Sequence, residues 1–574
     1  MRPRHPGRWW SAAAAILAVV WVAGTLSHPT SSSTGAGRAP GTGTPKAGCI
    51  GVAVVSSQEK ASLLAALAAE FDHGNPTQSG ACVDVRVNTL ASGSAETALA
   101  ADWHGAAGPA PTVWSPASTS WLGLLRFDRG VADLPDILPA SSPNLMQSPL
   151  VLAMPRPMAV AMGWPNVPVG WSDILKLAQD PEGWGRYGHP EWGLFRLGKT
   201  SPLESTSGLH ALIATYYAAT GISADLTAAD VTDPRVVAFV KGVEASVLHY
   251  GNTVATFLDG LRAADKAGAA MSYVSAVATE ETQVLSYDAA HPNTPLVAVY
   301  PKDGTLVADH PYAVLNATWV SDAQRAAATT FLQWLLEPAQ QARFTAAGFR
   351  DSAGHAPPGL TVDDGIVPAG PAVRIKPPEP AVIALIRRSW ADVRKRARVL
   401  LVIDTSGSMA GDKIAAVQKA AVLVVKAFSS DDELGFWTFS TQVDERVPVA
   451  PVGSGIDVID QIQALQAEGS TALYRATDDA VRTMRQDWDP ERINAVILLT
   501  DGQNDDSNQD LSALLSKLRQ GAEERPVPVF TIAYGSDADL STLAQISAAT
   551  HGRSYNAPDP DQVGAVFADV VADF

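Results

Sequence analysis

Two runs of consecutive apolar residues, each closed by an aspartate, constrain this chain most. Residues 399–404 read VLLVID and residues 494–501 read NAVILLTD. A strand with apolar side chains on consecutive positions has to be covered on both faces, as in a parallel sheet between two layers of helices. The carboxyl ends of such strands share one edge of the sheet, where α/β folds bind ligands. Asp404 and Asp501 are therefore expected at one functional edge.

Hydroxyl groups follow the first aspartate in the segment 401–413, LVIDTSGSMAGDK. Ser406 and Ser408 lie two residues apart, so an extended turn presents both hydroxyls to one point, and Gly407 lets the backbone bend. Thr471, in the loop sequence GST, offers a third hydroxyl. Three neutral oxygens and two carboxylates suit Mg²⁺ or Mn²⁺. The alternative is a strand-to-helix turn in which the aspartate or the second serine only caps the helix.

The pattern DTSGS…GST…TDG resembles the metal-ion-dependent adhesion site (MIDAS) of von Willebrand factor type A (VWA) domains, which have a doubly wound parallel fold. The resemblance covers residues 399–574. It implies five metal ligands: Asp404, Ser406, Ser408, Thr471 and Asp501. In that family an acidic residue of a protein partner completes the metal shell, so the implied activity is protein binding.

A metallohydrolase is the catalytic alternative, and it needs a general base beside a metal-bound water. Asp505 and Asp506 are the candidates for that base. However, no histidine lies near the ligand segments, and Mg²⁺ held mostly by neutral ligands is a poor generator of hydroxide. We therefore expect that the protein is not an enzyme.

Residues 48–350 alternate apolar strand-like runs with helical patterns, which predicts an α/β architecture with mainly parallel sheets. They resemble the extracellular solute-binding proteins of ABC importers through three segments: IGVAVVSSQEKASLLAALAAEF, LGKTSPLESTSGLHALIATYYAATG and FLQWLLEPAQQARFTAAGFR. The resemblance implies a two-lobed, type II periplasmic-binding-protein-like module with a ligand cleft at the hinge. We expect one lobe at about 49–150 with 311–350 and the other at 151–310.

Three turns rich in serine and threonine each open an expected helix in this half. Hydroxyl and backbone N–H groups at helix N-termini favour anions, so we expect a small polar or anionic solute, such as an oxyanion, in the cleft. Ordinary N-capping is the alternative explanation for each residue. The candidates are Ser56, Ser57, Ser92, Ser94, Ser205, Thr206 and Ser207.

The N-terminus reads as a membrane anchor with a tether. A basic stub over residues 1–8 precedes an apolar run over 9–26 that is long enough to cross a bilayer, and residues 27–47 are typical of a flexible spacer. The basic flank places the N-terminus in the cytoplasm and the bulk of the chain outside. We expect an uncleaved single-pass anchor in the cell membrane, with a cleaved signal peptide as the alternative.

Cys49 and Cys82 are the only cysteines, and each starts an apolar strand-like run. An extracytoplasmic compartment permits disulfides. We therefore predict a Cys49–Cys82 bridge if the two strands are neighbours.

The formal net charge of −17 argues against nucleic acid or an anionic membrane surface as a general partner. Residues 351–398 are expected as a proline-rich linker followed by a basic connector helix. The whole chain thus resembles an actinobacterial-type envelope protein that joins a solute-binding-like module to a metal-dependent adhesion domain. The alternative is an ABC-type solute or oxyanion receptor in which the C-terminal domain is an accessory tether.

Overall fold

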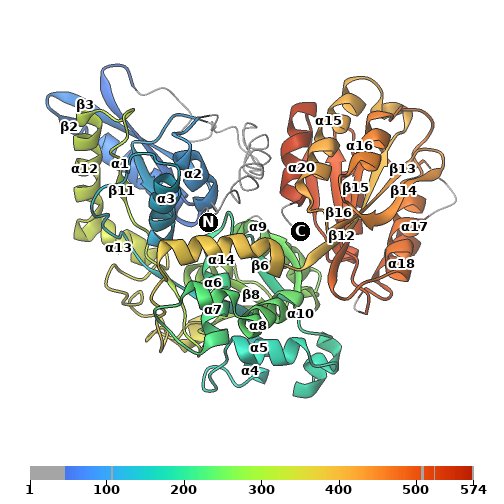
Figure 1. The fold of residues 1–574 in the computed structure, drawn as a ribbon, viewed down its shortest axis with the longest axis horizontal. Coiled ribbons are helices and arrows are strands. Elements are labelled where there is room, and N and C mark those ends of the chain that lie inside the picture. The colour runs from blue at the N-terminus through green and yellow to red at the C-terminus, as the bar shows by residue number, and fades with distance from the viewer. Residues whose placement is uncertain (1–45, 105–107, 252, 506–509, 523, 572–573) are drawn as a thin grey trace, which may run out of the picture. The chain divides into compact units, whose positions relative to one another are not determined.

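The computed structural model divides into two compact units, which are described separately (Figure 1). Of the described residues, those of 46–104 and 108–395 together with residue 574 form the N-terminal unit, and those of 396–571 form the C-terminal unit. The structure describes residues 46–104, 108–251, 253–505, 510–522, 524–571 and 574. The expected anchor at 9–26 lies outside them. Within the described ranges, no helix has both the length and the apolar character that a membrane crossing requires.

The N-terminal unit is built from two lobes, each with its own sheet. The sheet of the first lobe takes its strands from residues 49–115 and 313–314, and the sheet of the second lobe takes its strands from residues 148–308. The first sheet has the strand order β11-β4-β1-β3-β2, with bounds Cys49–Ser56 (β1), Thr77–Gln78 (β2), Ala81–Thr89 (β3), Val113–Ser115 (β4) and Ala313–Val314 (β11). The second sheet has the order β10-β5-β8-β6-β7, with β9 beside β5; the bounds are Ser148–Pro155 (β5), Leu197–Thr200 (β6), Val247–Gly251 (β7), Ala276–Glu280 (β8), Leu296–Val299 (β9) and Val307–Ala308 (β10).

The two sheets differ in strand direction. In the first lobe, β1 runs parallel to both β3 and β4. In the second lobe, β5 runs antiparallel to β8, β9 and β10, while β6 runs parallel to β7 and β8. The expectation of mainly parallel sheets is therefore wrong for the second lobe. The chain enters this lobe through β5 and leaves it through β10, and the entering strand runs against its neighbours.

Helices cover both sheets of the N-terminal unit. Those of the first lobe are α1 (Gln58–His73), α2 (Ser92–Ala100), α3 (Thr119–Val131), α12 (Asp322–Leu335) and α13 (Pro338–Ala346). Those of the second lobe are α4 (Arg156–Ala161), α5 (Trp171–Ala178), α6 (Thr206–Thr220), α7 (Ala228–Thr232), α8 (Pro234–Ala245), α9 (Val254–Lys266), α10 (Ala270–Tyr273) and α11 (Glu281–Asp288). Leu64, Leu67 and Phe71 recur along one face of α1 and are buried in the first-lobe core, because their spacing of three and four residues follows the helical turn. Phe71 packs there on Phe331 of α12, with ring centroids 5.0 Å apart.

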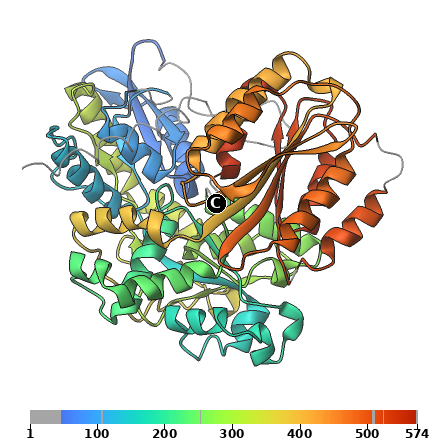
Figure 2. The same cartoon turned by 45° about the vertical axis from the view of Figure 1, so that its right-hand side comes forward.

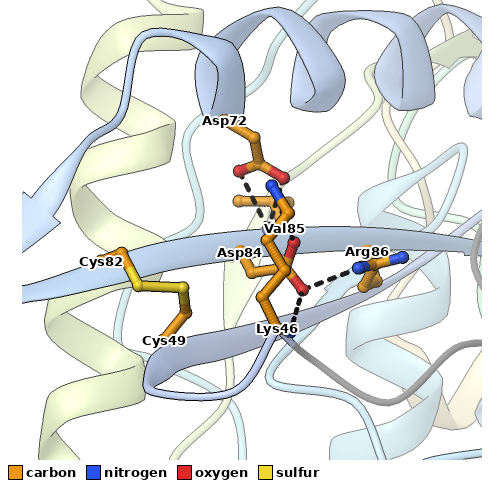
Figure 3. Close-up of a disulfide and its surroundings, with 7 residues drawn as sticks. All are labelled: Lys46, Cys49, Asp72, Cys82, Asp84, Val85 and Arg86. Carbon is orange, nitrogen blue, oxygen red and sulfur yellow. Dashed lines mark hydrogen bonds and ion pairs between the residues drawn. A yellow bond between two sulfur atoms is a disulfide. The ribbon is translucent and has the colours of Figure 1, made fainter.

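A disulfide joins the first strands of the first lobe (Figure 3). Cys49 and Cys82 are register partners in the parallel pair β1/β3, and their sulfur atoms are bonded. Beside them the buried carboxylate of Asp84 accepts hydrogen bonds from Nε of Arg86 at 2.9 Å and from the backbone N–H of Lys46 at 3.1 Å. Burial alone would raise the pKa of Asp84, but these hydrogen bonds outweigh it and leave that pKa below its ordinary value.

The C-terminal unit is a single doubly wound sheet with helices on both faces (Figure 2). Its strand order is β14-β13-β12-β15-β16-β17, with bounds Arg396–Asp404 (β12), Glu433–Phe439 (β13), Val443–Pro451 (β14), Arg492–Thr500 (β15), Val529–Tyr534 (β16) and Ser554–Ala557 (β17). The helices are α15 (Asp412–Ala427), α16 (Ile456–Gln463), α17 (Leu473–Gln486), α18 (Leu511–Arg519), α19 (Leu540–Ala549) and α20 (Val563–Val571). Helix α15 packs with α16 and α20, whereas α18 packs with α17 and α19.

The strand order reverses at β12, which is what positions the candidate site. Strand β12 pairs in parallel with β13 on one side and β15 on the other, and only β14 runs antiparallel to its neighbour. Chain connections therefore leave β12 and β15 toward opposite faces of the sheet, and the carboxyl ends of these strands form the switch point at which open α/β sheets have their ligand crevice. Residues 399–404 are all fully buried, in agreement with a strand covered on both faces.

Replacing both cysteines, as Cys49→Ala with Cys82→Ala, is expected to lower the unfolding free energy of the N-terminal unit by about 3–4 kcal/mol. The bridge closes a loop across a sequence separation of 33, and in the chain-entropy model such a cross-link restricts the unfolded chain. Urea denaturation followed by tryptophan fluorescence measures the change, because all described tryptophans except Trp437 and Trp488 lie in this unit. Addition of a reductant should destabilise the parent protein and leave the double variant unaltered; equal sensitivity of both proteins would contradict the prediction.

Candidate functional site

Asp404 is the last residue of β12, and its side chain is fully buried at the crevice. Its Oδ1 accepts the backbone N–H of Ser406 at 2.7 Å, and its Oδ2 accepts the hydroxyl of Thr500 at 2.5 Å. Burial raises the pKa of Asp404 to about 6, although both hydrogen bonds oppose the rise. A buried carboxylate that is costly to ionise is better accommodated when a cation lies beside it.

The two serines bring the ends of β12 and β15 together. Ser406 and Ser408 flank the first residue of a short 3₁₀ turn over Gly407–Met409, and their hydroxyl oxygens lie 3.0 Å apart. The Ser408 hydroxyl donates to Oδ1 of Asp501 at 2.7 Å, across 93 residues of sequence. The first and last of the expected ligand segments are thus in direct contact.

Thr471 lies in the loop before α17 and is tied to the segment that follows β15. The backbone N–H of Asp505 donates to the carbonyl of Thr471 at 2.8 Å, and the N–H of Thr471 donates to the Asp505 carboxylate at 3.2 Å. A Cβ on Gly502 would lie 3.2 Å from the Thr471 hydroxyl oxygen, so the residue after Asp501 has to be small there. The structure therefore places the hydroxyl of Thr471 beside the neighbour of Asp501.

Two side chains at this edge were not predicted from the sequence. Thr500 holds Asp404, as described above, and Nζ of Lys413 forms an ion pair with Oδ2 of the fully buried Asp501. The sequence feature that could have indicated Lys413 is its position two residues after Gly411, in the first turn of α15, which follows the turn that carries Ser406 and Ser408. The signal for Thr500 was only its position next to Asp501 at the end of a buried strand.

This donor set fits a hard cation. Its side chains offer carboxylate and hydroxyl oxygens only, which is the chemistry that Mg²⁺ and Mn²⁺ accept. Across the part of the chain that is described, no group of three or more His, Cys, Asp or Glu side chains could hold a metal ion, so a cation at this edge would depend on the hydroxyls. The ammonium group of Lys413 already provides a positive charge against Asp501, as a stand-in for such a cation.

The serine-rich turns of the N-terminal unit are arranged differently. Ser57 accepts a hydrogen bond from Nζ of Lys60 and donates to Glu59, both on α1. Ser56 is fully buried at the end of β1 and donates to the carbonyl of Ser57 at 3.0 Å. These two residues therefore interact within their own turn.

The remaining turns meet each other across the two lobes. The Thr206 hydroxyl of α6 donates to the hydroxyl of Ser92 of α2 at 3.4 Å. Ser94 donates to the carboxylate of Glu204 in the second lobe. Ser205 and Ser207 lie 2.9 Å apart at the start of α6. Ser57 and Ser205 occupy N-cap positions, but neither side chain makes a capping hydrogen bond, so ordinary capping does not account for them.

Two family models match the chain. The model described as bacterial extracellular solute-binding protein matches residues 52–350, and the von Willebrand factor type A domain model matches residues 399–569. Residues 351–398 lie between the two matches. Each match lies within one of the two units of the structure, and the N-terminal unit also includes residues 351–395.

Individual proteins are similar to most of the chain or to part of it. The chain is 25% identical to an uncharacterized protein of Mycobacterium tuberculosis (strain ATCC 25618 / H37Rv) over 91% of its own length and 77% of that protein. It is 27% identical to inter-alpha-trypsin inhibitor heavy chain H4 of Sus scrofa over 28% of this chain and 18% of that protein.

Solved structures also show similarity to part of the chain. A von Willebrand factor type A structure from Catenulispora acidiphila is 21% identical, with 31% of this chain and 43% of that chain covered and a TM-score of 0.28. A periplasmic thiamin binding protein is 13% identical, with 60% of this chain and 95% of that chain covered and a TM-score of 0.40.

Proposed function

Because the chain belongs to the bacterial extracellular solute-binding proteins and carries a C-terminal VWA domain, we propose that it is an extracytoplasmic binding protein whose VWA domain binds a protein partner through a divalent metal ion. Asp404, Ser406, Ser408, Thr471 and Asp501 would hold the ion, which is Mg²⁺ or Mn²⁺. When bound, the ion supplies a Lewis-acidic position for a carboxylate of the partner. The matched families are binding and interaction families, and we propose no catalytic step.

One observation carries the proposal: a continuous chain of hydrogen bonds links Asp404, Ser406, Ser408 and Asp501 at the ends of two adjacent strands. Helix capping alone does not require it. Ser408 points its hydroxyl to an aspartate on another strand, and no side chain caps α15. Convergence of oxygen atoms from two strand ends is the geometry that a cation needs.

The charge of the site favours an acidic partner. Asp404 and Asp501 contribute two negative charges when ionised, Lys413 contributes one positive charge, and the carboxylate of Asp505 lies on the backbone N–H of Thr471. A divalent ion would add two positive charges beside these groups. The Lys413 side chain is 29% exposed, so its ammonium group can also reach a carboxylate that approaches from solvent.

We propose the cell envelope as the location, with residues 9–26 as a single-pass membrane anchor and residues 27–47 as a tether. The solute-binding-like module spans 48–350, the connecting segment 351–398 and the VWA domain 399–574. The alternative function is an ABC-type receptor for a small polar or anionic solute, in which the VWA domain is an accessory tether. The family match of residues 52–350 supports that alternative.

The substitution Asp404→Asn is expected to weaken Mn²⁺ binding at least about 100-fold, because it removes one of the two negatively charged ligands. Isothermal titration calorimetry of the full chain measures the affinity. The matched control is Asp457→Asn, an exposed aspartate at the start of α16. Equal affinities of all three proteins would contradict a metal site at Asp404.

The substitution Lys413→Met is expected to tighten Mn²⁺ binding about tenfold, because it removes a like charge that competes with the ion for Asp501. The same calorimetric titration measures the change. Lys419→Met, an exposed lysine further along α15, serves as the control and should leave the affinity unaltered. Weaker binding by the Lys413 variant would show that this side chain supports the site.

Partner capture should depend on both the metal and the ligand set. We expect an immobilised full chain to retain envelope proteins in the presence of Mg²⁺ and to lose them with EDTA. The Asp404→Asn chain should fail to retain them under both conditions. Quantitative mass spectrometry of the eluates compares the four samples, and a set of proteins that is insensitive to both EDTA and the substitution would argue against metal-dependent adhesion.

A further inference from the structure

Helix α14 (Pro380–Val393) lies outside both family matches and packs on the N-terminal unit. One face of the helix is buried: Ile383, Ala384, Ile386, Trp390 and Val393. The helix contacts α3 of the first lobe and α6, α7 and α8 of the second lobe (Figure 1). A single helix therefore touches both lobes of the solute-binding module.

Arg387 makes the polar contact of α14 with the first lobe. Its Nη1 donates to Oε2 of Glu96 on α2 at 3.2 Å and lies 3.8 Å from Asp128 on α3. The guanidinium group also stacks over the ring of Trp121, 5.4 Å from the centroid. Glu96 is 2% exposed and burial raises its pKa to about 7, so the guanidinium group is what favours its charged form.

Ser389 and Trp390 make the contacts with the second lobe. The hydroxyl oxygens of Ser389 and Tyr216 on α6 lie 2.7 Å apart. The ring of Trp390 packs edge-on against Tyr250 of β7, with centroids 4.8 Å apart. Lys199 of β6 places its ammonium group 5.8 Å from the centre of the same ring. Residues 387 and 390 are less than one helical turn apart, so one turn of α14 bridges the lobes.

The lobes also contact each other directly at the start of α2. The backbone N–H of Gly93, at the start of α2, donates to the carbonyl of Glu204 in the second lobe at 3.0 Å. A Cβ on Gly93 would lie 1.8 Å from the carbonyl oxygen of Leu203, so even a methyl group has no room there. The carboxylate of Glu204 accepts the hydroxyl of Ser94 in the first turn of α2. The chain thus places its own carboxylate where an anionic solute was expected.

The segment between β10 and β11, where the chain returns to the first lobe, also contacts both lobes. His310 is fully buried between β10 and β11, on the segment that returns to the first lobe. Its Nδ1 lies 3.4 Å from Glu59 on α1, and its Nε2 lies 3.5 Å from Glu280 at the end of β8. The imidazole ring of His310 therefore lies between a carboxylate of the first lobe and a carboxylate of the second lobe.

We propose that α14 is an intramolecular clasp that holds the two lobes closed on a cleft filled by Glu204. In two-lobed binding proteins the lobes close around a ligand, which supplies contacts to both. Here Arg387, Trp390 and Glu204 supply such contacts from within the chain. An interaction that is made only in the closed state shifts the equilibrium toward that state.

The clasp gives the solute-binding module a role other than solute capture. A module that stands closed on its own carboxylate is a rigid carrier for the domain that follows α14, and an external anion would have to displace Glu204 first. The clasp does not depend on the metal site, so either idea can fail without the other.

Hydrogen–deuterium exchange of the full chain tests the clasp. The double variant Arg387→Glu/Trp390→Ala removes the contact with each lobe, and we expect the amide of Gly93 and the start of α6 to exchange at least about tenfold faster. A second variant, Glu204→Ala, leaves α14 and the backbone carbonyl of residue 204 intact but removes the carboxylate that accepts the Ser94 hydroxyl, so it should loosen this contact between the lobes and accelerate exchange at Gly93 as well. Arg388→Glu is the matched control, because Arg388 is the exposed neighbour of Arg387.

Strand β3 provides the internal check that the lobes remain folded, since its amides pair with β1 within the first lobe. If β3 stays protected and Gly93 exchanges faster only in the clasp and Glu204 variants, the proposal is supported. If α14 itself exchanges freely in the double variant while Gly93 keeps its protection, the lobes close without the helix, and the proposal is overturned.

Discussion

The reversal of strand order at β12 is the constraint on which the candidate metal site depends. The chain continues from β12 to β13 and from β15 to β16, toward opposite edges of the sheet, so the connections that follow these two adjacent strands lie on opposite faces and the polar residues at their carboxyl ends come together. Asp404 is buried at this point and accepts hydrogen bonds on both carboxylate oxygens. The buried strands on either side of it provide the rigid support that a precise ligand geometry requires.

Preorganisation at this edge comes from hydroxyl groups more than from charge. Oδ1 of Asp501 accepts a hydrogen bond from the Ser408 hydroxyl, and Oδ2 forms an ion pair with Lys413. Both oxygens of this carboxylate are therefore already oriented. Because two of the five proposed ligands are carboxylates and one of these is countered by an ammonium group, a divalent ion held by them would keep part of its positive charge. That residual charge is what a carboxylate of a partner would meet.

Both units carry hydroxyl groups at the ends of parallel strands, but these groups contact different partners in the two units. In both, hydroxyl-bearing residues follow parallel strands and open helices. In the C-terminal unit these hydroxyls converge on two buried aspartates. In the N-terminal unit the helix that starts at Ser92 receives the carbonyl and carboxylate of Glu204 from the opposite lobe. The segment between the family matches contributes α14 to that closure, so it is part of a folded unit and not only a connection.

Residues close in sequence, read with the periodicity of strands and helices, were enough to predict the α/β architecture and the positions of Asp404, Ser406 and Ser408, whereas the two modules were predicted from resemblances to known families. The local pattern was sufficient for these predictions because a strand with apolar side chains at every position has to be buried on both faces of the sheet. The last residue of such a strand marks the edge of the sheet. Antiparallel pairing of β5 was not predictable in this way, because strand direction depends on where the chain enters the lobe. Lys413 meets Asp501 across 88 residues, Ser94 meets Glu204 across 110, and Arg387 meets Glu96 across 291. Only the tertiary structure decided these contacts, since each depends on how separately folded elements pack and not on any repeat within the sequence.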